Sequence, residues 1–151
     1  MGQKTGEGMQ IVSRYFEDLT VRELYEILRL RSEVFVVEQQ CIYQDMDGKD
    51  PESLHVFLMQ DGRLEACLRA YVREEGVVQM GRVVTRHHGR GYGGVLLRAG
   101  LEKVREEMHP RQIVLEAQSY AVSFYEREGF RTCSEEFLED GIPHVQMKLE
   151  L

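Results

Sequence analysis

The chain has 151 residues, 42% of them hydrophobic, and a formal net charge of -7 at pH 7. This size fits one domain with a full core and leaves no room for a second domain. The negative charge argues against a nucleic-acid partner, because proteins that bind a phosphate backbone carry a basic face.

The three cysteines (Cys41, Cys67 and Cys133) are far apart and form no C-x-x-C pair. This usage argues against a disulfide framework or a zinc knuckle and fits a reducing cytoplasm. Residues 1–9 lack the apolar segment of a signal peptide, and no apolar run reaches membrane-spanning length. We therefore expect a cytoplasmic protein without a membrane partner, with a flexible leader over residues 1–9 and a single domain over residues 10–151.

Residues 10–17 are predicted to form the first strand. Thr20 and Glu23 then give the T-x-x-E pattern of a capping box, which predicts the start of a helix. Apolar residues recur at helical spacing to about Gln39, although the β-branched FVVE end could equally be irregular. Residues 40–53 are rich in Asp, Gly and Pro and are expected to form a long loop of the kind that often binds ligands.

Three strands are predicted next, over residues 54–60, 64–75 and 77–85. Their apolar residues alternate, and Asp61-Gly62 and Glu75-Gly76 separate them. Asp61-Gly62 is a strong hairpin signal, because type I′ turns need positive φ, and Glu75-Gly76 is a second turn. The three strands should therefore be successive and antiparallel.

A helix is predicted after the glycine-rich stretch that follows, because Leu97, Leu101 and Met108 keep helical spacing until Pro110. Residues 113–117 then read as a buried strand, parallel to residues 77–85 through a right-handed crossover.

The last part of the chain should contain a short helix and two strands. Ser119 is expected to cap the helix, which carries Tyr125, and Gly129 stands where a left-handed C′ residue is wanted. Residues 130–139 and 142–151 are predicted strands around the turn Asp140-Gly141. The whole is an α/β domain (an α+β mixed sheet), mostly antiparallel with one parallel β-α-β crossover and helices on both faces.

Residues 83–97, VVTRHHGRGYGGVLL, combine a strand, a glycine-rich turn and a helix N-terminus. Free N–H groups at a helix N-terminus and glycines that allow close approach make an anion site, which predicts a phosphate-bearing ligand. The glycines also satisfy the dinucleotide pattern G-x-G-x-x-G, with Glu116 following. However, a Rossmann domain needs further parallel units, and too little chain remains after Glu116 to supply them.

The same stretch, followed by SYAVSFYEREGF at residues 119–130, resembles the acetyl-CoA motif of GNAT-fold N-acetyltransferases. The earlier block LRLRSEVFVVEQQCIYQDMDGKDPESLHVFL is similar to the ElaA-like branch of that superfamily. The resemblance implies a GNAT fold, acetyl-CoA as cosubstrate, and direct transfer of the acetyl group to a primary amine of a small molecule or peptide. A catalytically weak acyl-CoA-binding or sensing module of the same fold is the alternative.

By this resemblance, acetyl-CoA contacts residues of the strand, the loop and the later helix. These are Val83, Val84, His88, Gly89, Arg90, Gly91, Tyr92, Gly93, Gly94, Gln118 and Tyr125. The family loop usually begins with Arg or Gln, where this chain has His88. The other register, Arg86-x-x-Gly89-x-Gly91, would start the helix two residues earlier. In the His88 register, His88 contacts the pyrophosphate, and Arg86 or Arg90 supplies the cation.

The resemblance makes Tyr125 the general acid. A base is wanted more strongly, because keeping a lysine-like amine of pKa about 10.4 neutral at pH 7 costs about 4.6 kcal/mol. A general acid helps less, because the pKa of a thiolate leaving group, about 8.5, is only about 1.5 units from pH 7, or about 2 kcal/mol. The strand before the loop offers Gln79 and no carboxylate.

Candidates for the base therefore come from the ElaA-like block. They are chiefly Glu38, Asp47 and His55, with Glu33, Asp45 and Asp50 as further acids, and a chain of water molecules is an equal option. Two adjacent histidines, His87 and His88, show no ligand spacing with other residues, so no metal is expected. Terminal strands leave a sheet edge through which a homodimer could form.

Overall fold

The computed structural model describes residues 2–6, 8–39 and 44–151. Within these residues, nine strands form one sheet in the order β1-β2-β3-β4-β5-β6-β9-β7, and β8 pairs with β9. The strands are β1 (Gly2–Gly6), β2 (Met9–Tyr15), β3 (Leu54–Gln60), β4 (Arg63–Glu74), β5 (Val77–Thr85), β6 (Gln112–Gln118), β7 (Arg131–Thr132), β8 (Phe137–Glu139) and β9 (Ile142–Glu150). The helices are α1 (Val21–Arg31), α2 (Tyr92–Met108) and α3 (Val122–Glu126).

All neighbouring strands are antiparallel except β5 and β6, which run parallel and are joined by α2. The predicted mixed sheet with a single parallel crossover is thereby confirmed. The first hairpin turn also forms as expected, because Asp61 and Gly62 have φ values of 52° and 78°.

Helix α1 begins at the predicted capping box. The Thr20 hydroxyl accepts a hydrogen bond from the Glu23 N–H (3.0 Å), and the Glu23 carboxylate accepts one from the Thr20 N–H (2.9 Å). Beyond Arg31 the helix continues as a π-helical segment, Ser32–Glu38. From the sequence, this β-branched stretch could have been either helical or irregular. Such segments are rare and often lie at functional sites.

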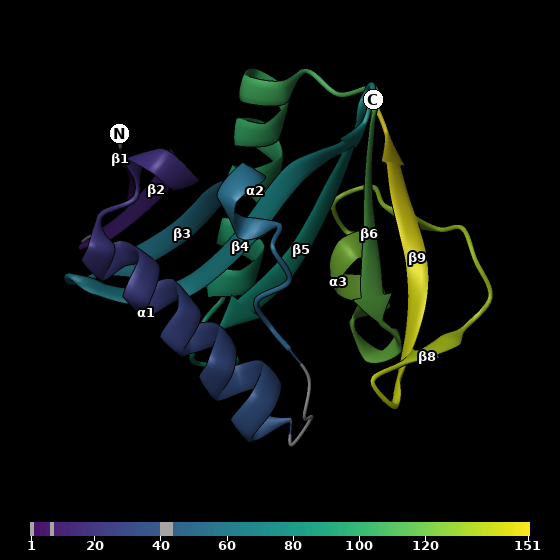
Figure 1. Ribbon diagram of the computed structural model, residues 1–151, viewed down its shortest axis with the longest axis horizontal. Helices are drawn as coiled ribbons and strands as arrows, with labels where there is room; N and C mark the ends of the chain where they lie inside the picture. The colour runs from purple at the N-terminus through teal and green to yellow at the C-terminus, as the bar shows by residue number, and fades with distance from the viewer. Residues whose placement is uncertain (1, 7, 40–43) are drawn as a thin grey trace.

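Helices cover both faces of the sheet, as predicted: α1 lies on one face and α2 on the other (Figure 1). Ile27 and Leu30 of α1 belong to one buried cluster. Leu97, Leu101 and Val104 of α2 belong to a second and larger one.

Strands β5 and β6 separate like the arms of a V (Figure 1). Their pairing covers Val77↔Gln112 to Gln79↔Val114, after which both strands continue apart. β5 also contains a bulge, because Cys67↔Val84 and Arg69↔Gly81 leave two residues of β5 opposite one of β4. One of these two, Arg82, has a φ of 51°, which is uncommon for a residue other than glycine.

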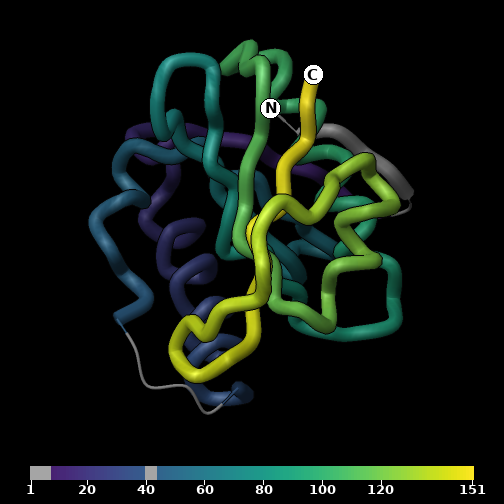
Figure 2. The backbone as a smooth tube through the Cα atoms, turned by 90° about the vertical axis from the view of Figure 1, so that its right-hand side faces the viewer, coloured from purple at the N-terminus to yellow at the C-terminus, as the bar shows by residue number. Residues whose placement is uncertain are grey.

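Two details of the C-terminal region correct the sequence prediction. Ser119 does not cap α3; it begins a 3₁₀ turn, and its hydroxyl donates to the Glu136 carboxylate (2.8 Å). The strand expected over residues 130–139 is interrupted: within that stretch two short strands form, β7 and β8, and each pairs with β9. Strand β9 runs beside β6 (Figure 2).

At the N-terminus, β1 lies within the stretch expected to be a flexible leader and pairs with β2. Residues 1 and 7 of that leader lie outside the described residues, as do Cys41 and the first part of the predicted loop, residues 40–43. Cys67 is buried and Cys133 is exposed, both as free thiols. In the described parts of the chain, no helix is long and apolar enough to cross a membrane.

Candidate active site

A cavity of about 580 Å³, here called the loop cavity, lies between the glycine-rich loop, the first turn of α2 and α3. It brings together nine of the predicted acetyl-CoA contacts. These are Val83, Val84, His88, Gly89, Gly91, Tyr92, Gly93, Gly94 and Tyr125. Arg90 is exposed on the loop outside this lining, and Gln118 lies in a second cavity.

The N-terminus of α2 opens into the loop cavity. Helix α2 starts at Tyr92, one residue before the Gly93 start of the His88 register and one after the start that the other register gives. Its N-cap, Gly91, is left-handed (φ 76°), and the first helical hydrogen bond runs from the Val95 N–H to the Gly91 carbonyl (3.3 Å). The N–H groups of the first turn therefore have no acceptor within the helix, and the helix dipole adds partial positive charge there. This end of α2 suits a phosphate group.

Acidic side chains hold the basic residues of the loop. Arg86 donates to Glu33 (2.9 Å) and lies 3.6 Å from Glu65, which also binds Nδ1 of His87 (2.8 Å). His88 is mostly exposed and pairs with Glu38 of the π-helical segment (3.2 Å). Arg86 is thus committed to the protein itself, whereas His87 and His88 also line the loop cavity.

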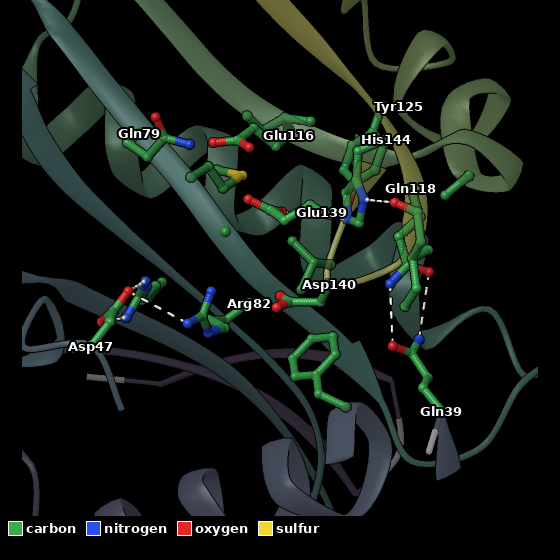
Figure 3. A pocket seen from close by; sticks show the side chains of 18 of the residues that line it. Gln39, Asp47, Gln79, Arg82, Glu116, Gln118, Tyr125, Glu139, Asp140 and His144 are labelled. Carbon is green, nitrogen blue, oxygen red and sulfur yellow. Dashed lines mark hydrogen bonds and ion pairs between the residues drawn. The ribbon is translucent and has the colours of Figure 1, made fainter. Parts of the chain in front are cut away.

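A second cavity of about 540 Å³, here called the sheet cavity, lies on the face that carries α1. Its walls come from the π-helical segment, the loop around Asp47, strands β4, β5 and β6, and the β8–β9 hairpin. Gln39, just after the π-helical segment, and Gln118 of β6 exchange amide hydrogen bonds across it (3.2 and 3.5 Å; Figure 3). The side chains that give it charge are Asp47, Arg69, Arg73, Arg82, Glu116, Glu139 and Asp140.

The two cavities meet where β5 leaves β6. Four residues line both of them: Val83, Tyr120, Ala121 and Tyr125. Val83 follows directly after the bulge residue Arg82. The Tyr125 ring is buried against Phe124 (ring centroids 5.0 Å apart) and Phe130 (6.0 Å). The two cavities therefore adjoin at these four residues.

A network of arginine and aspartate side chains fixes the bulge. Arg82 donates from Nε to the Asp45 carboxylate and from Nη2 to the Asp45 carbonyl, both at 2.9 Å. Asp45 in turn accepts from Nε of Arg31 (3.0 Å). These contacts hold Arg82 in its strained backbone conformation, which costs about 1–3 kcal/mol.

The buried half of this network joins Asp50 to two arginines. Arg31 donates to both oxygens of Asp50 (2.7 and 3.2 Å), and Arg69 donates to one of them (3.1 Å). Burial opposes ionisation of Asp50, but these hydrogen bonds outweigh it, so its pKa is lowered. Arg69 also forms a two-pronged pair with Asp47 (2.6 and 2.8 Å).

The chain matches known proteins along nearly its whole length. The GNAT acetyltransferase domain family matches residues 9–151. This chain belongs to that family. The crystal structure of Escherichia coli ElaA, itself similar to this GNAT protein, has a TM-score of 0.88 and 32% identity, covering 94% of this chain and 99% of that one. The expected ElaA-like branch is thereby confirmed.

Two further relatives support the same placement. The crystal structure of an acyl-CoA N-acyltransferase from Pseudomonas aeruginosa has a TM-score of 0.87 and 39% identity, covering 93% of this chain and 99% of that one. A UPF0039 protein of Schizosaccharomyces pombe is 42% identical over 147 residues, which are 95% of this chain and 98% of that protein. The GNAT fold implies that an acyl-CoA is bound.

The predicted bases of this GNAT protein stand in places that argue against that role. Asp47 lines the sheet cavity, but the hydrogen bonds from Arg69 lower its pKa, so it holds a proton weakly. His55 is buried outside both cavities, burial lowers its pKa, and its Nε2 donates to the Asp50 carbonyl (3.0 Å). Glu38 is exposed, pairs with His88 and lines neither cavity. In the described residues, no group of three or more His, Cys, Asp or Glu side chains is placed to hold a metal ion.

The sequence interpretation missed Glu116 as a residue of the sheet cavity. It considered this glutamate only as the ribose-binding acid of a dinucleotide fold, whereas the side chain lies in the sheet cavity, with Gln79, Glu139 and His144 nearby (Figure 3). A signal was present, because polar residues Glu116 and Gln118 alternate with buried Leu115 and Ala117 along β6. That alternation places both polar side chains on the face opposite the core of α2.

Proposed function

We propose that this protein is an acetyl-CoA-dependent N-acetyltransferase, which moves an acetyl group directly to a primary amine of a small molecule or peptide. The observation that carries the proposal is the junction of the two cavities at Val83 and Tyr125. Direct transfer requires the thioester and the amine to adjoin in one complex, and such positioning lowers the barrier by removing translational and rotational freedom beforehand. A donor entering through the loop cavity would meet an acceptor from the sheet cavity at this point.

The loop cavity supplies what a CoA donor needs. The N–H groups at the start of α2 suit the pyrophosphate, each hydrogen bond to a charged acceptor being worth about 1.5–3 kcal/mol. The edge of β5 that faces away from β4 leaves β6 after Gln79, and the peptide-like arm of the donor can pair with it as an added strand would. The preference for acetyl over longer acyl groups rests on the likeness to acetyltransferases.

At the junction, the backbone N–H of Val83 or Val84 is the expected donor to the developing oxyanion. The amine nitrogen bonds to the thioester carbon, the C–S bond breaks, and the departing sulfur takes a proton. Tyr125 is the proposed source of that proton. Burial, with a smaller contribution from Tyr120, raises the pKa of the Tyr125 phenol, which therefore carries its proton throughout the neutral range.

Ligand binding and turnover test this function separately. Acetyl-CoA should raise the melting temperature more than NAD does, since a ligand at 100 times its Kd stabilises the fold by about 2.7 kcal/mol. A panel of primary amines should then release CoA, measured as free thiol. If neither CoA nor acetyl-CoA raises the melting temperature, the proposal is refuted. Binding of acetyl-CoA without thiol release across the panel would favour the sensing module. A cytoplasmic location and a homodimer stay predictions.

A further inference from the structure

The sheet cavity contains a pair of carboxyl groups that the arginine network does not use. Glu116 projects from β6 and Glu139 from β8, both line the cavity, and their carboxyl groups lie beside each other (Figure 3). A proton taken up by one carboxylate can be shared with the other through a hydrogen bond. The pair is therefore suited to hold a proton removed from a ligand.

Several groups surround the pair. His144 of β9 lies with Nε2 3.6 Å from the Glu139 carboxylate, while its Nδ1 bonds to the Ile142 carbonyl (2.7 Å). Arg73 of β4 acts on Glu116 electrostatically, and Gln79 of β5 faces it across the gap (Figure 3). Burial raises the pKa of Glu116, the charge of Glu139 and the bond to it raise it further, and His144 and Arg73 partly oppose this. The shift brings the pKa of Glu116 closer to 7, and a carboxylate with such a pKa is a more effective base at neutral pH.

We propose that Glu116 is the base that deprotonates the acceptor, that Glu139 is its positioning partner, and that the acceptor is an alkylamine which arrives as an ammonium ion. This inference deepens the proposed function and rests on it. An ammonium group suits this wall of the cavity because the pair is anionic, and the net charge of -7 attracts cations to the whole protein. Phe35 and Tyr71, which also line the cavity, give apolar surface for the alkyl stem.

The protons balance in two steps. The Glu116 carboxylate takes a proton from the ammonium group, which leaves a neutral amine and a protonated Glu116 that shares this proton with Glu139. The amine then attacks the thioester, and the new N–C bond replaces the C–S bond. The departing thiolate receives its proton from Tyr125, which regains one as the amide nitrogen loses its extra proton. The pair returns its own proton to solvent, so that one proton is released overall.

The test compares two amines of similar size, ethylamine, which is protonated at pH 7, and 2,2,2-trifluoroethylamine, whose fluorines make it far less basic. Acetyl-CoA binding is first measured by calorimetry on the wild type, Glu116→Gln, Glu139→Gln and the control Glu135→Gln. Glu135 is exposed, lies near the same hairpin and lines neither cavity. All four proteins should bind acetyl-CoA alike, and thiol release then gives kcat/KM from pH 6 to 9.

Glu116→Gln should lower kcat/KM for ethylamine by about 10²-fold at pH 7, the lower range for loss of a general base. For trifluoroethylamine the loss should be at most about threefold, because the amine needs no base to become neutral. Glu139→Gln should move the acidic limb of the wild-type pH profile to lower pH, since it removes the partner that raises the pKa of Glu116. Glu135→Gln should change neither amine's kcat/KM.

Three results would overturn the inference while leaving acetyl-CoA binding intact. They are an unchanged rate of Glu116→Gln with ethylamine, an equal loss with both amines, and a wild type that acetylates neither amine. Failure of the wild type to bind acetyl-CoA would instead overturn the proposed function itself. The outcome for Glu139→Gln stands independently if Glu116→Gln does not fold.

Discussion

The loop cavity and the sheet cavity differ in how the chain builds them. The loop cavity takes most of its lining from one stretch, residues 83–94, with α3 added from residues 120–128. The sheet cavity draws on six separate segments, from Phe35 to His144, and buried charges hold its walls. The first site depends on local backbone geometry and the second on long-range ion pairs. Substitutions in the two cavities should therefore have different effects on the protein.

The largest effect should come from breaking the buried network beside the sheet cavity. Asp50→Asn removes the charge that compensates Arg31 and Arg69, both almost fully buried. Leaving buried charges unpaired typically costs about 3–5 kcal/mol, so the free energy of unfolding in urea should fall by that amount. Asp18→Asn, at an exposed position, is the control and should change it by less than about 0.5 kcal/mol.

The same variant has a signature in its pH dependence. The pKa of Asp50 in the folded protein lies below its unfolded value of about 3.9. Its contribution to stability is therefore complete above that value and disappears as the pH falls toward the folded pKa. Asp50→Asn should lose this part of the acid sensitivity. A variant as stable as the wild type at pH 7 would show that the network does not hold the sheet cavity together.

At the junction of the cavities, Tyr125→Phe keeps the ring and removes the proton. We expect kcat to fall by up to about 30-fold, the factor that corresponds to the 1.5 units between a thiol pKa of about 8.5 and pH 7. Steady-state thiol release should show little change in KM for acetyl-CoA. Tyr25→Phe, on the exposed side of α1, is the matched control. A normal kcat at all pH values would remove Tyr125 from the chemistry.

On the loop side, Gly91→Ala should weaken acetyl-CoA binding. The N-cap has a φ of 76°, and a left-handed conformation costs a residue with a side chain roughly 1–2 kcal/mol, or about 5- to 30-fold in Kd by calorimetry. Gly62→Ala is the matched control, because its φ of 78° imposes the same strain in a hairpin turn that does not line the loop cavity. Equal loss of affinity in both variants would show that the effect is one of general stability.

The smallest effect is expected at the unusual histidine. His88→Arg should tighten acetyl-CoA binding by about threefold, because an exposed ion pair contributes about 0.2–1 kcal/mol. Calorimetry at two salt concentrations should show the gain shrinking at high salt. No change in His88→Arg together with a loss in Arg86→Ala would contradict the chosen register of the loop.

The sequence predicted features that depend on neighbouring residues better than features that depend on distant ones. The capping box at Thr20, the turn at Asp61-Gly62 and the stop at Pro110 depend on neighbouring residues, and each was predicted correctly. The glycine-rich loop was predictable for the same reason. Ser119 resembled a cap locally, but its hydroxyl found Glu136 across the fold instead.

The acids of the long loop show where prediction stopped. Asp45, Asp47 and Asp50 were candidate bases because of their residue type. Their partners Arg31, Arg69 and Arg82 lie on α1, β4 and β5, so only the folded topology reveals that these carboxylates are engaged. Glu116 was overlooked for the converse reason, since its partner Glu139 lies on a strand that pairs with β9 rather than with β6.

In the π-helical segment Ser32–Glu38, the number of residues decides which way the side chains point. Val34 lines the loop cavity and Phe35 the sheet cavity, while Glu33 and Glu38 bind the loop. In an α-helix each residue adds a rotation of about 100°, so losing one residue here would restore regular helix and turn these side chains to other directions. A single insertion or deletion here would therefore change the walls of both cavities at once.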